Sequence, residues 1–276
     1  MQEMTRERAA AILGSPPDFR DGPEDNPISA GLPAGSITDD TMQALLVAQL
    51  LIDGDGAIEP RAFADALIAW EADMARRGRR ELLGPSTKRA IEALRAGADP
   101  LRTGRFGTTN GAAMRITPVG IATRLDKLVD AVVAADLVTH DTPVAHAGAA
   151  VVATVVSAGV EGASFDEAAP LAIANAERFG YGEVFEDPAF DTGVETLESV
   201  RAAFAIASVN PRSTSEAWVH AAGLGGDSDT IAAMAGAMVG ACTGLSTFPP
   251  AAVRKVREVN QLDLEPITKQ LLALRR

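Results

Sequence analysis

The chain has 276 residues, of which 47% are hydrophobic, so it is long enough to bury a core without disulfides or structural metals. Its formal net charge of −12 argues against a nucleic-acid-binding protein, because such a protein needs a basic face to replace the counterions of the phosphates. The only cysteine, Cys242, excludes an internal disulfide framework and a cysteine-rich zinc site, and it fits a reducing compartment.

Targeting and membrane signals are weak in this sequence. The N-terminus has no apolar core of the kind found in a signal peptide. The longest apolar stretches, 147–160 and 231–245, are shorter than the roughly 20 residues that a membrane-spanning helix needs. We therefore expect a soluble, cytoplasmic protein with no nucleic-acid or membrane partner, and the sequence leaves the oligomeric state open.

Apolar residues recur at helical spacing from one end of the chain to the other. Residues 15–36 are rich in proline and glycine and are expected to be irregular, and residues 104–120 form a Gly-rich turn followed by a helical stretch that Pro118 interrupts. The spacing predicts helices at 5–13, 37–53, 60–77, 85–96, 126–136, 142–158, 166–179, 196–209, 213–222, 229–244, 250–258 and 265–275. No run alternates as a strand does, so we expect an all-α fold. We expect a single domain over 1–276, with 180–195 as the weakest possible boundary.

Two of the predicted helices begin with paired acids and hydroxyl groups. The residues are Thr38, Asp39 and Asp40 at the first helix, and Asp227, Ser228, Asp229 and Thr230 at the second. Taken singly, each cluster is explained equally well as a helix cap that also complements the helix dipole. Taken together, they indicate a hard divalent cation, because such ions prefer several carboxylate and hydroxyl oxygens. These groups are suited to one Mg²⁺ or to two such ions.

The helix that follows the second cluster carries small residues four positions apart. Ala232, Gly236, Gly240 and Gly244 share one face, because residues i and i+4 are neighbours on a helix. We expect this face to pack tightly in the core and to form a rigid support beneath the cluster.

Three further motifs carry weaker signals. His146 lies on an apolar helix and is expected to be a core histidine, whereas His140 either caps the following helix or faces a site. The turn "TTNGAAMR", which ends in Arg115, either cradles a phosphate through its backbone N–H groups or is an ordinary Gly-containing turn. The stretch "DGDGAIEP" from Asp53 lacks the acids of a calcium loop and is expected to be a turn and a helix cap.

Four blocks of the sequence, in order, resemble the ADP-ribosylglycohydrolase family, which includes the hydrolase that removes ADP-ribose from dinitrogenase reductase. The blocks are "ITDDTMQALLVAQLL", "TTNGAAMRITPVG", "VTHDTPVAHAGAAVVA" and "GGDSDTIAAMAGAMVGA". The first and last resemble the two metal motifs and are specific together, and the middle blocks are supportive. The resemblance covers about residues 30–245. It implies a compact orthogonal helical bundle and a hydrolase that cleaves the glycosidic bond of an ADP-ribosyl or smaller ribosyl compound.

The resemblance also implies roles for individual residues. It implies two Mg²⁺ or Mn²⁺ ions, with Thr38, Asp39, Asp40, Asp227, Asp229 and Thr230 as their ligands. Asp39 or Asp40 would act as the base that assists the attacking water. Contacts to the substrate, small or protein-linked, would come from Asn110, Gly111, Met114, Arg115, His140, Gly226 and Ser228.

The sequence departs from the family pattern at two places. The family's usual first helix and its Gly-Asp motif have no counterpart here, and Gln2 or Glu3 stands near an expected acid. Leu82 stands where many relatives carry an acid. These departures favour one alternative, a catalytically inactive family member that binds ADP-ribose or metal. A helical scaffold with no metal is the third interpretation.

Overall fold

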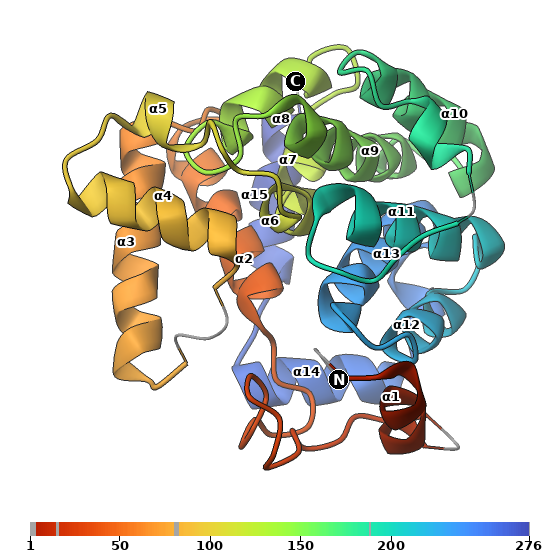
Figure 1. Ribbon diagram of the computed structural model, residues 1–276. Helices are drawn as coiled ribbons and strands as arrows, with labels where there is room; N and C mark the ends of the chain where they lie inside the picture. Colours follow the sequence, from red (N-terminus) through yellow and green to blue (C-terminus); the bar gives the residue numbers. More distant parts are fainter. Residues whose placement is uncertain (1–3, 15–16, 80–82, 188, 276) are drawn as a thin grey trace.

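The computed structural model describes residues 4–14, 17–79, 83–187 and 189–275, and in this part of the chain every regular element is a helix (Figure 1). The α-helices are α1 Arg6–Leu13, α2 Asp39–Asp53, α3 Pro60–Arg76, α4 Pro85–Arg95, α5 Pro100–Thr103, α6 Gly111–Met114, α7 Thr117–Ala122, α8 Leu128–Asp136, α9 Pro143–Val160, α10 Phe165–Glu177, α11 Thr196–Val209, α12 Thr214–Ala222, α13 Ser228–Thr243, α14 Pro250–Asn260 and α15 Glu265–Leu274. The described residues also form the 3₁₀ turns η2 Glu183–Phe185 and η3 Leu245–Thr247. The all-α expectation is confirmed.

The core is built around α9. Every residue from Ala145 to Gly159 is buried, because the helix is packed on several sides by α7, α8, α10, α11 and α13. Among the described residues, α9 is also the one helix whose length and hydropathy are sufficient to cross a membrane, yet 83% of it is covered by the rest of the protein. Its apolar composition is therefore accounted for by the core position.

The small-residue face of α13 differs from the expectation of tight packing. A Cβ built on Gly240 would clash with the ring of Phe248 at 2.9 Å, so close packing holds at this position. A Cβ on Gly236 would meet nothing within 4 Å, so this glycine lies in open space. An open depression of about 450 Å³ passes over both glycines, with walls from α7, α9 and α15. The expectation was wrong at Gly236 because sequence spacing defines a helix face but not what covers it.

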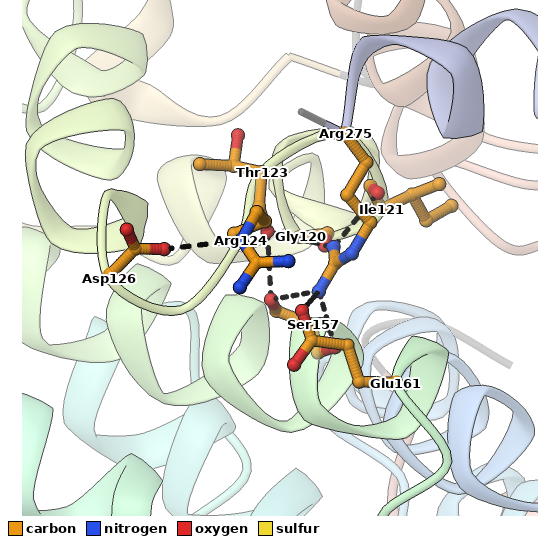
Figure 2. Close-up of polar contacts among 8 residues, drawn as sticks. All are labelled: Gly120, Ile121, Thr123, Arg124, Asp126, Ser157, Glu161 and Arg275. Carbon is orange, nitrogen blue, oxygen red and sulfur yellow. Dashed lines mark hydrogen bonds and ion pairs between the residues drawn. The ribbon is translucent and has the colours of Figure 1, made fainter.

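Arg275, next to the end of the chain, connects the ends of α7 and α9 (Figure 2). Its guanidinium donates to the carbonyls of Gly120 and Thr123 at the end of α7, at 2.9 and 2.8 Å. It also donates to the carbonyl of Ser157 at 2.8 Å and to the Glu161 carboxylate at 2.8 Å, at the end of α9. The last carbonyls of a helix have no partner within it, so Arg275 satisfies the ends of two core helices at once.

Helix α2 is placed where it can carry a site. It packs against α6, α7 and α13, and its inner face buries Val47, Ala48 and Leu51. The helical stretch that Pro118 was expected to interrupt is divided into two short helices, α6 and α7, with Pro118 in the first turn of α7.

Candidate functional site

The two acidic clusters predicted from the sequence lie together at the N-terminal ends of α2 and α13. Asp39, Asp40 and Asp227 are each at most 5% exposed. Asp39 feels the charges of Asp40, Asp229 and Asp227, so carboxylates separated by about 190 residues in sequence share one electrostatic neighbourhood. The helix N-terminal dipoles favour this gathering of negative charge, although they do not remove the repulsion within it.

Helix capping does not account for either cluster. Thr38 and Asp227 occupy the cap positions of α2 and α13, yet neither side chain accepts a hydrogen bond from its helix. Thr38 Oγ1 instead donates to Asp40 Oδ2 at 2.6 Å, and Thr230 Oγ1 donates to Asp227 Oδ1 at 3.1 Å. Elsewhere the chain caps its helices in the usual way, as at Thr142. The hydroxyls are therefore turned toward the carboxylates, and the simpler of the two interpretations is not supported.

Among the described residues, three carboxylate oxygens of this cluster are buried and have no hydrogen-bond partner. They are Oδ1 of Asp40 and both oxygens of Asp229. The Asp229 residue as a whole is only half-buried, but its two charged atoms are covered. A buried carboxylate without a partner is costly, so such atoms call for a cation or a proton.

The pKa values of the carboxyl groups also reflect the cost of burying several carboxylates together. Burial raises the pKa of Asp229 well above its ordinary value of 3.8, and the charges of Asp40 and Asp227 raise it further. Burial also raises the pKa of Asp39 well above this value, and raises that of Asp40. The pKa of Asp227 rises to about 6, chiefly through burial and the Asp40 charge. Without a bound cation, protonation of these carboxylates stabilises the folded protein.

The donor set fits a hard divalent cation by its chemistry. Carboxylate and hydroxyl oxygens are the ligands that Mg²⁺ and Mn²⁺ accept, and three of the oxygens have no competing partner. In the described residues, no three His, Cys, Asp or Glu side chains already stand at the spacing of a closed metal cage.

A third segment, 192–196, joins the α13 cluster to the Gly-rich loop. Thr192 O accepts from Asp227 N at 2.7 Å, and Val194 O accepts from Asn110 N at 3.0 Å. Thr196 donates back to Thr108 O through its backbone N–H at 3.1 Å. This part of the predicted boundary region 180–195 is thus hydrogen-bonded to both site loops and connects them. Its sequence, Thr-Gly-Val-Glu-Thr, gives no local signal of these contacts, because the partners lie in distant loops.

Asn110 connects the Gly-rich loop directly to the acids. Its Nδ2 donates to Asp227 Oδ2 at 2.5 Å and to Ser199 Oγ at 2.9 Å. Gly111 and Met114 follow in α6 and are buried, and a Cβ on Gly111 would come within 2.8 Å of the His140 ring. Asn110 therefore lies in the cluster, whereas Gly111 is required for close packing beneath it.

The side chains of Arg115 and His140 are buried and bonded to other parts of the protein. Arg115 is 1% exposed, donates to Gln43 Oε1 at 2.7 Å and to Thr139 Oγ1, and stacks over the ring of Phe63. His140 is fully buried, and its pKa is lowered well below the ordinary value, first by burial and then by Arg115. Their polar atoms already have internal partners, and the expectation that they contact substrate stays a prediction.

His146 is a further buried polar side chain near Arg115 and His140. Its ring lies between Asp136 at 3.1 Å and Asp141 at 3.2 Å, and these carboxylates outweigh burial and raise its pKa. His146 is thus a core histidine, as expected, but an ion-paired one. Burial raises the pKa of Asp136 to about 6.

Gly225 and Gly226 bring the chain into the cluster. Both have positive φ, +74° and +61°, which glycine adopts without strain. Gly226 N donates to Met4 O at 2.9 Å, and a Cβ on Gly226 would come within 2.3 Å of Thr192 O. Neighbouring Ser228 is 1% exposed, whereas Gly226 is half-buried.

The residues behind the two predicted departures, Gln2 or Glu3 and Leu82, lie outside the described residues. Nothing in the geometry therefore bears on them.

Comparison with known proteins decides the family. The sequence profile of the ADP-ribosylglycohydrolase family matches residues 2–276. The chain belongs to the ADP-ribosylglycohydrolase family. A solved structure titled "ADP-ribosylglycohydrolase-related protein complex" superimposes with a TM-score of 0.72 at 25% identity, over 97% of this chain and 93% of the other.

Two curated relatives show where this ADP-ribosylglycohydrolase family member stands. It is 31% identical over 94% of its length to the uncharacterized protein YegU of Escherichia coli K12, of which the match covers 86%. It is also 31% identical over 82% of its length to the ADP-ribosylarginine hydrolase Tri1 of Pseudomonas putida GB-1, but this match spans only 63% of that protein. Family membership indicates a hydrolase of glycosidic bonds in ADP-ribosyl compounds.

Proposed function

We propose that this protein is a metal-dependent hydrolase that cleaves the glycosidic bond of an ADP-ribosyl or smaller ribosyl compound. The reaction would take place at the acidic cluster, with two bound Mg²⁺ or Mn²⁺ ions. The observation that carries the metal requirement is the set of three buried, unpartnered oxygens on Asp40 and Asp229. A fold that only needed helix caps would have turned Thr38 and Asp227 toward backbone amides instead.

The ligands on α2 would be Thr38, Asp39 and Asp40, and those on α13 would be Asp227, Asp229 and Thr230. When bound, the ions would supply Lewis-acid activation of water and an anchor for ribose hydroxyls. Both ligand groups stand on the first turn of a packed helix, which supports the precise placement that catalysis needs.

Asp39 is our preferred general base. It is 5% exposed, and its one side-chain hydrogen bond among the described residues is a long one from Gln43 Nε2 at 3.5 Å, which leaves the carboxylate able to accept a proton. Asp40, in contrast, accepts from Thr38 at 2.6 Å and is held in place by it. Asp39 would take the proton of the attacking water as the bond at the ribose anomeric carbon breaks.

Asn110 would hold the α13 side of the site in position. It donates to Asp227 Oδ2, leaving Oδ1 to the Thr230 hydroxyl, so both Asp227 oxygens have a fixed direction. Substrate contact by the backbone near Gly111 remains part of the proposal, because the loop 108–110 approaches the cluster through Asn110.

The test is turnover of defined glycosides. Purified protein is incubated with ADP-ribosylarginine, an ADP-ribosylated serine peptide and simple ribosides, each with EDTA, Mg²⁺ or Mn²⁺. We expect release of ADP-ribose or ribose only with metal, and its loss in Asp229→Asn. Asp126→Asn is the matched control, since the Asp126 side chain is 66% exposed on a loop of no proposed function. Metal binding without turnover of any substrate would contradict the hydrolase.

A further inference from the structure

The last residue of α14 is bonded to the chain just before the acidic cluster. Asn260 Oδ1 accepts from the backbone N–H of Ile37 at 3.0 Å, and its Nδ2 donates to the carbonyl of Gly35 at 2.7 Å. Nδ2 also donates to the carbonyl of Val256 at 2.7 Å, which fixes the amide relative to its own helix. Residues more than 220 positions apart are thereby joined at one side chain.

These bonds define how the chain enters α2. Ile37 directly precedes Thr38. The Thr38 hydroxyl donates a hydrogen bond to Asp40 and does not cap the helix. The direction of the backbone at this point must therefore be set by something other than a cap. The Asn260 amide does this by pairing with one N–H and one C=O, as a neighbouring strand would.

Helix α14 offers little else to hold this loop. No residue of α14 is buried, and the helix lies beside the loop that leads into α2 (Figure 1). Gly35, at φ +87°, passes close to Lys255, since a Cβ there would come within 3.1 Å of Lys255 Cγ. The side-chain amide of Asn260 is thus the directional contact in an otherwise lightly packed junction.

We propose that Asn260 is a positioning residue for the acidic cluster: through Gly35 and Ile37 it sets the orientation in which Thr38, Asp39 and Asp40 face a bound cation. This role rests on the metal-dependent function proposed above. Asn260 itself contacts neither ion nor substrate, so its removal weakens metal binding and leaves the chemical step of the loaded enzyme unchanged.

The experiment compares Mn²⁺ binding by isothermal titration calorimetry in the wild-type protein, Asn260→Ala, Asn260→Asp and Asn210→Ala. Asn210 is a matched control, because it also stands at the end of a helix and bonds the carbonyl four residues earlier, but it makes no bond to the backbone of a site loop. We expect about tenfold weaker Mn²⁺ binding in Asn260→Ala, from the loss of two hydrogen bonds. Asn260→Asp, which keeps the acceptor for Ile37, should fall between.

Two readouts separate positioning from simple loss of stability. The kcat at saturating Mn²⁺ should stay within about twofold of wild type. Amide hydrogen exchange at residues 37–40 should become faster in Asn260→Ala while exchange in α9 is unchanged. Equal Mn²⁺ affinity in wild type and Asn260→Ala would overturn the role of Asn260 alone. Absence of Mn²⁺ binding by the wild type would instead overturn the metal-dependent function and, with it, this role.

Discussion

Asn110 and Asp227, which are 117 residues apart in sequence, are joined by a hydrogen bond of 2.5 Å from Nδ2 to Oδ2. The bond connects the Gly-rich loop to Asp227, the residue before α13. The same Nδ2 also donates to Ser199 Oγ on α11. It links two of the sequence blocks that resembled the family. A charged acceptor makes this a strong bond, so it orders both loops around one carboxylate.

Replacing Asn110 should therefore damage the site more than the fold. In Asn110→Ala, Asp227 loses its amide donor, which corresponds to about 1.5–3 kcal/mol for a bond to a charged group. We expect kcat/KM to fall by tenfold or more, measured on the substrate that wild type turns over. Ser199→Ala, which leaves the bond to Asp227 in place, should lose much less. Equal losses in the two variants would contradict this assignment.

Neutralising one acid should stabilise the metal-free protein. Both Asp229 oxygens are buried without partners, so Asp229→Asn removes repulsion against the other carboxylates. We expect the free energy of unfolding in EDTA to rise by on the order of 1 kcal/mol. The increase in Tm that Mn²⁺ gives the wild type should disappear. Urea and thermal unfolding with and without Mn²⁺ test this, with Asp126→Asn as the neutral reference, and a destabilised Asp229→Asn in EDTA would count against it.

The metal-free protein should become more stable as the pH falls from 7.5 to 6. Asp227 and Asp136 have a pKa of about 6 in the folded protein against 3.8 unfolded, so the folded state takes up protons first. Asp229 and His146, whose pKa values are raised, act in the same direction. His140 opposes them, because its lowered pKa removes stability as pH falls below 6.5.

The groups with raised pKa values outnumber the single imidazole of His140. In EDTA, the free energy of unfolding should therefore decrease as the pH rises. With saturating Mn²⁺ the slope should reverse, because protons then compete with the ion for the same oxygens. Urea unfolding at pH 6.0, 6.7 and 7.5 measures both slopes. A rising stability with pH in EDTA would show that the carboxylates are not in conflict with one another.

Arg115 should behave as a core residue. Arg115→Met keeps much of the stem that stacks on Phe63 but leaves the acceptors on Gln43 and Thr139 without their donor. Removing one partner from a buried polar network costs about 3–5 kcal/mol, so we expect a large fall in Tm. The exposed Arg102→Met provides the control. A stable variant with a raised KM would restore the substrate role expected from the motif.

Arg275 should contribute to global stability. In Arg275→Ala the end carbonyls of α7 and α9 lose a charged donor, which corresponds to about 2–3 kcal/mol in total. Arg124→Ala is a close control, because Arg124 lies in the same region but is 54% exposed and pairs only loosely with Asp126 at 3.6 Å (Figure 2). Thermal unfolding in EDTA compares the two, and equal Tm values would contradict a capping role.

The sequence predicted the helices well and the pairing of the clusters, but not the way they are held. The helix at 196–209 was placed to the residue by its apolar spacing. The convergence of Asp40 and Asp229 followed from the likeness of the two helix starts. The direction of Arg115 did not, because it depends on Gln43, which belongs to a distant helix. Asn260 showed no sequence signal, since its partners are backbone atoms.

The most direct measurement is the Mn²⁺ binding isotherm of the wild-type protein beside Asp40→Asn, Asp229→Asn and Asp126→Asn. If the N-terminal ends of α2 and α13 form one metal site, the wild type and Asp126→Asn bind saturably, with up to two ions, and binding is lost in both cluster variants. No saturable binding in the wild type, or equal binding in all four proteins, would contradict a metal centre at this cluster.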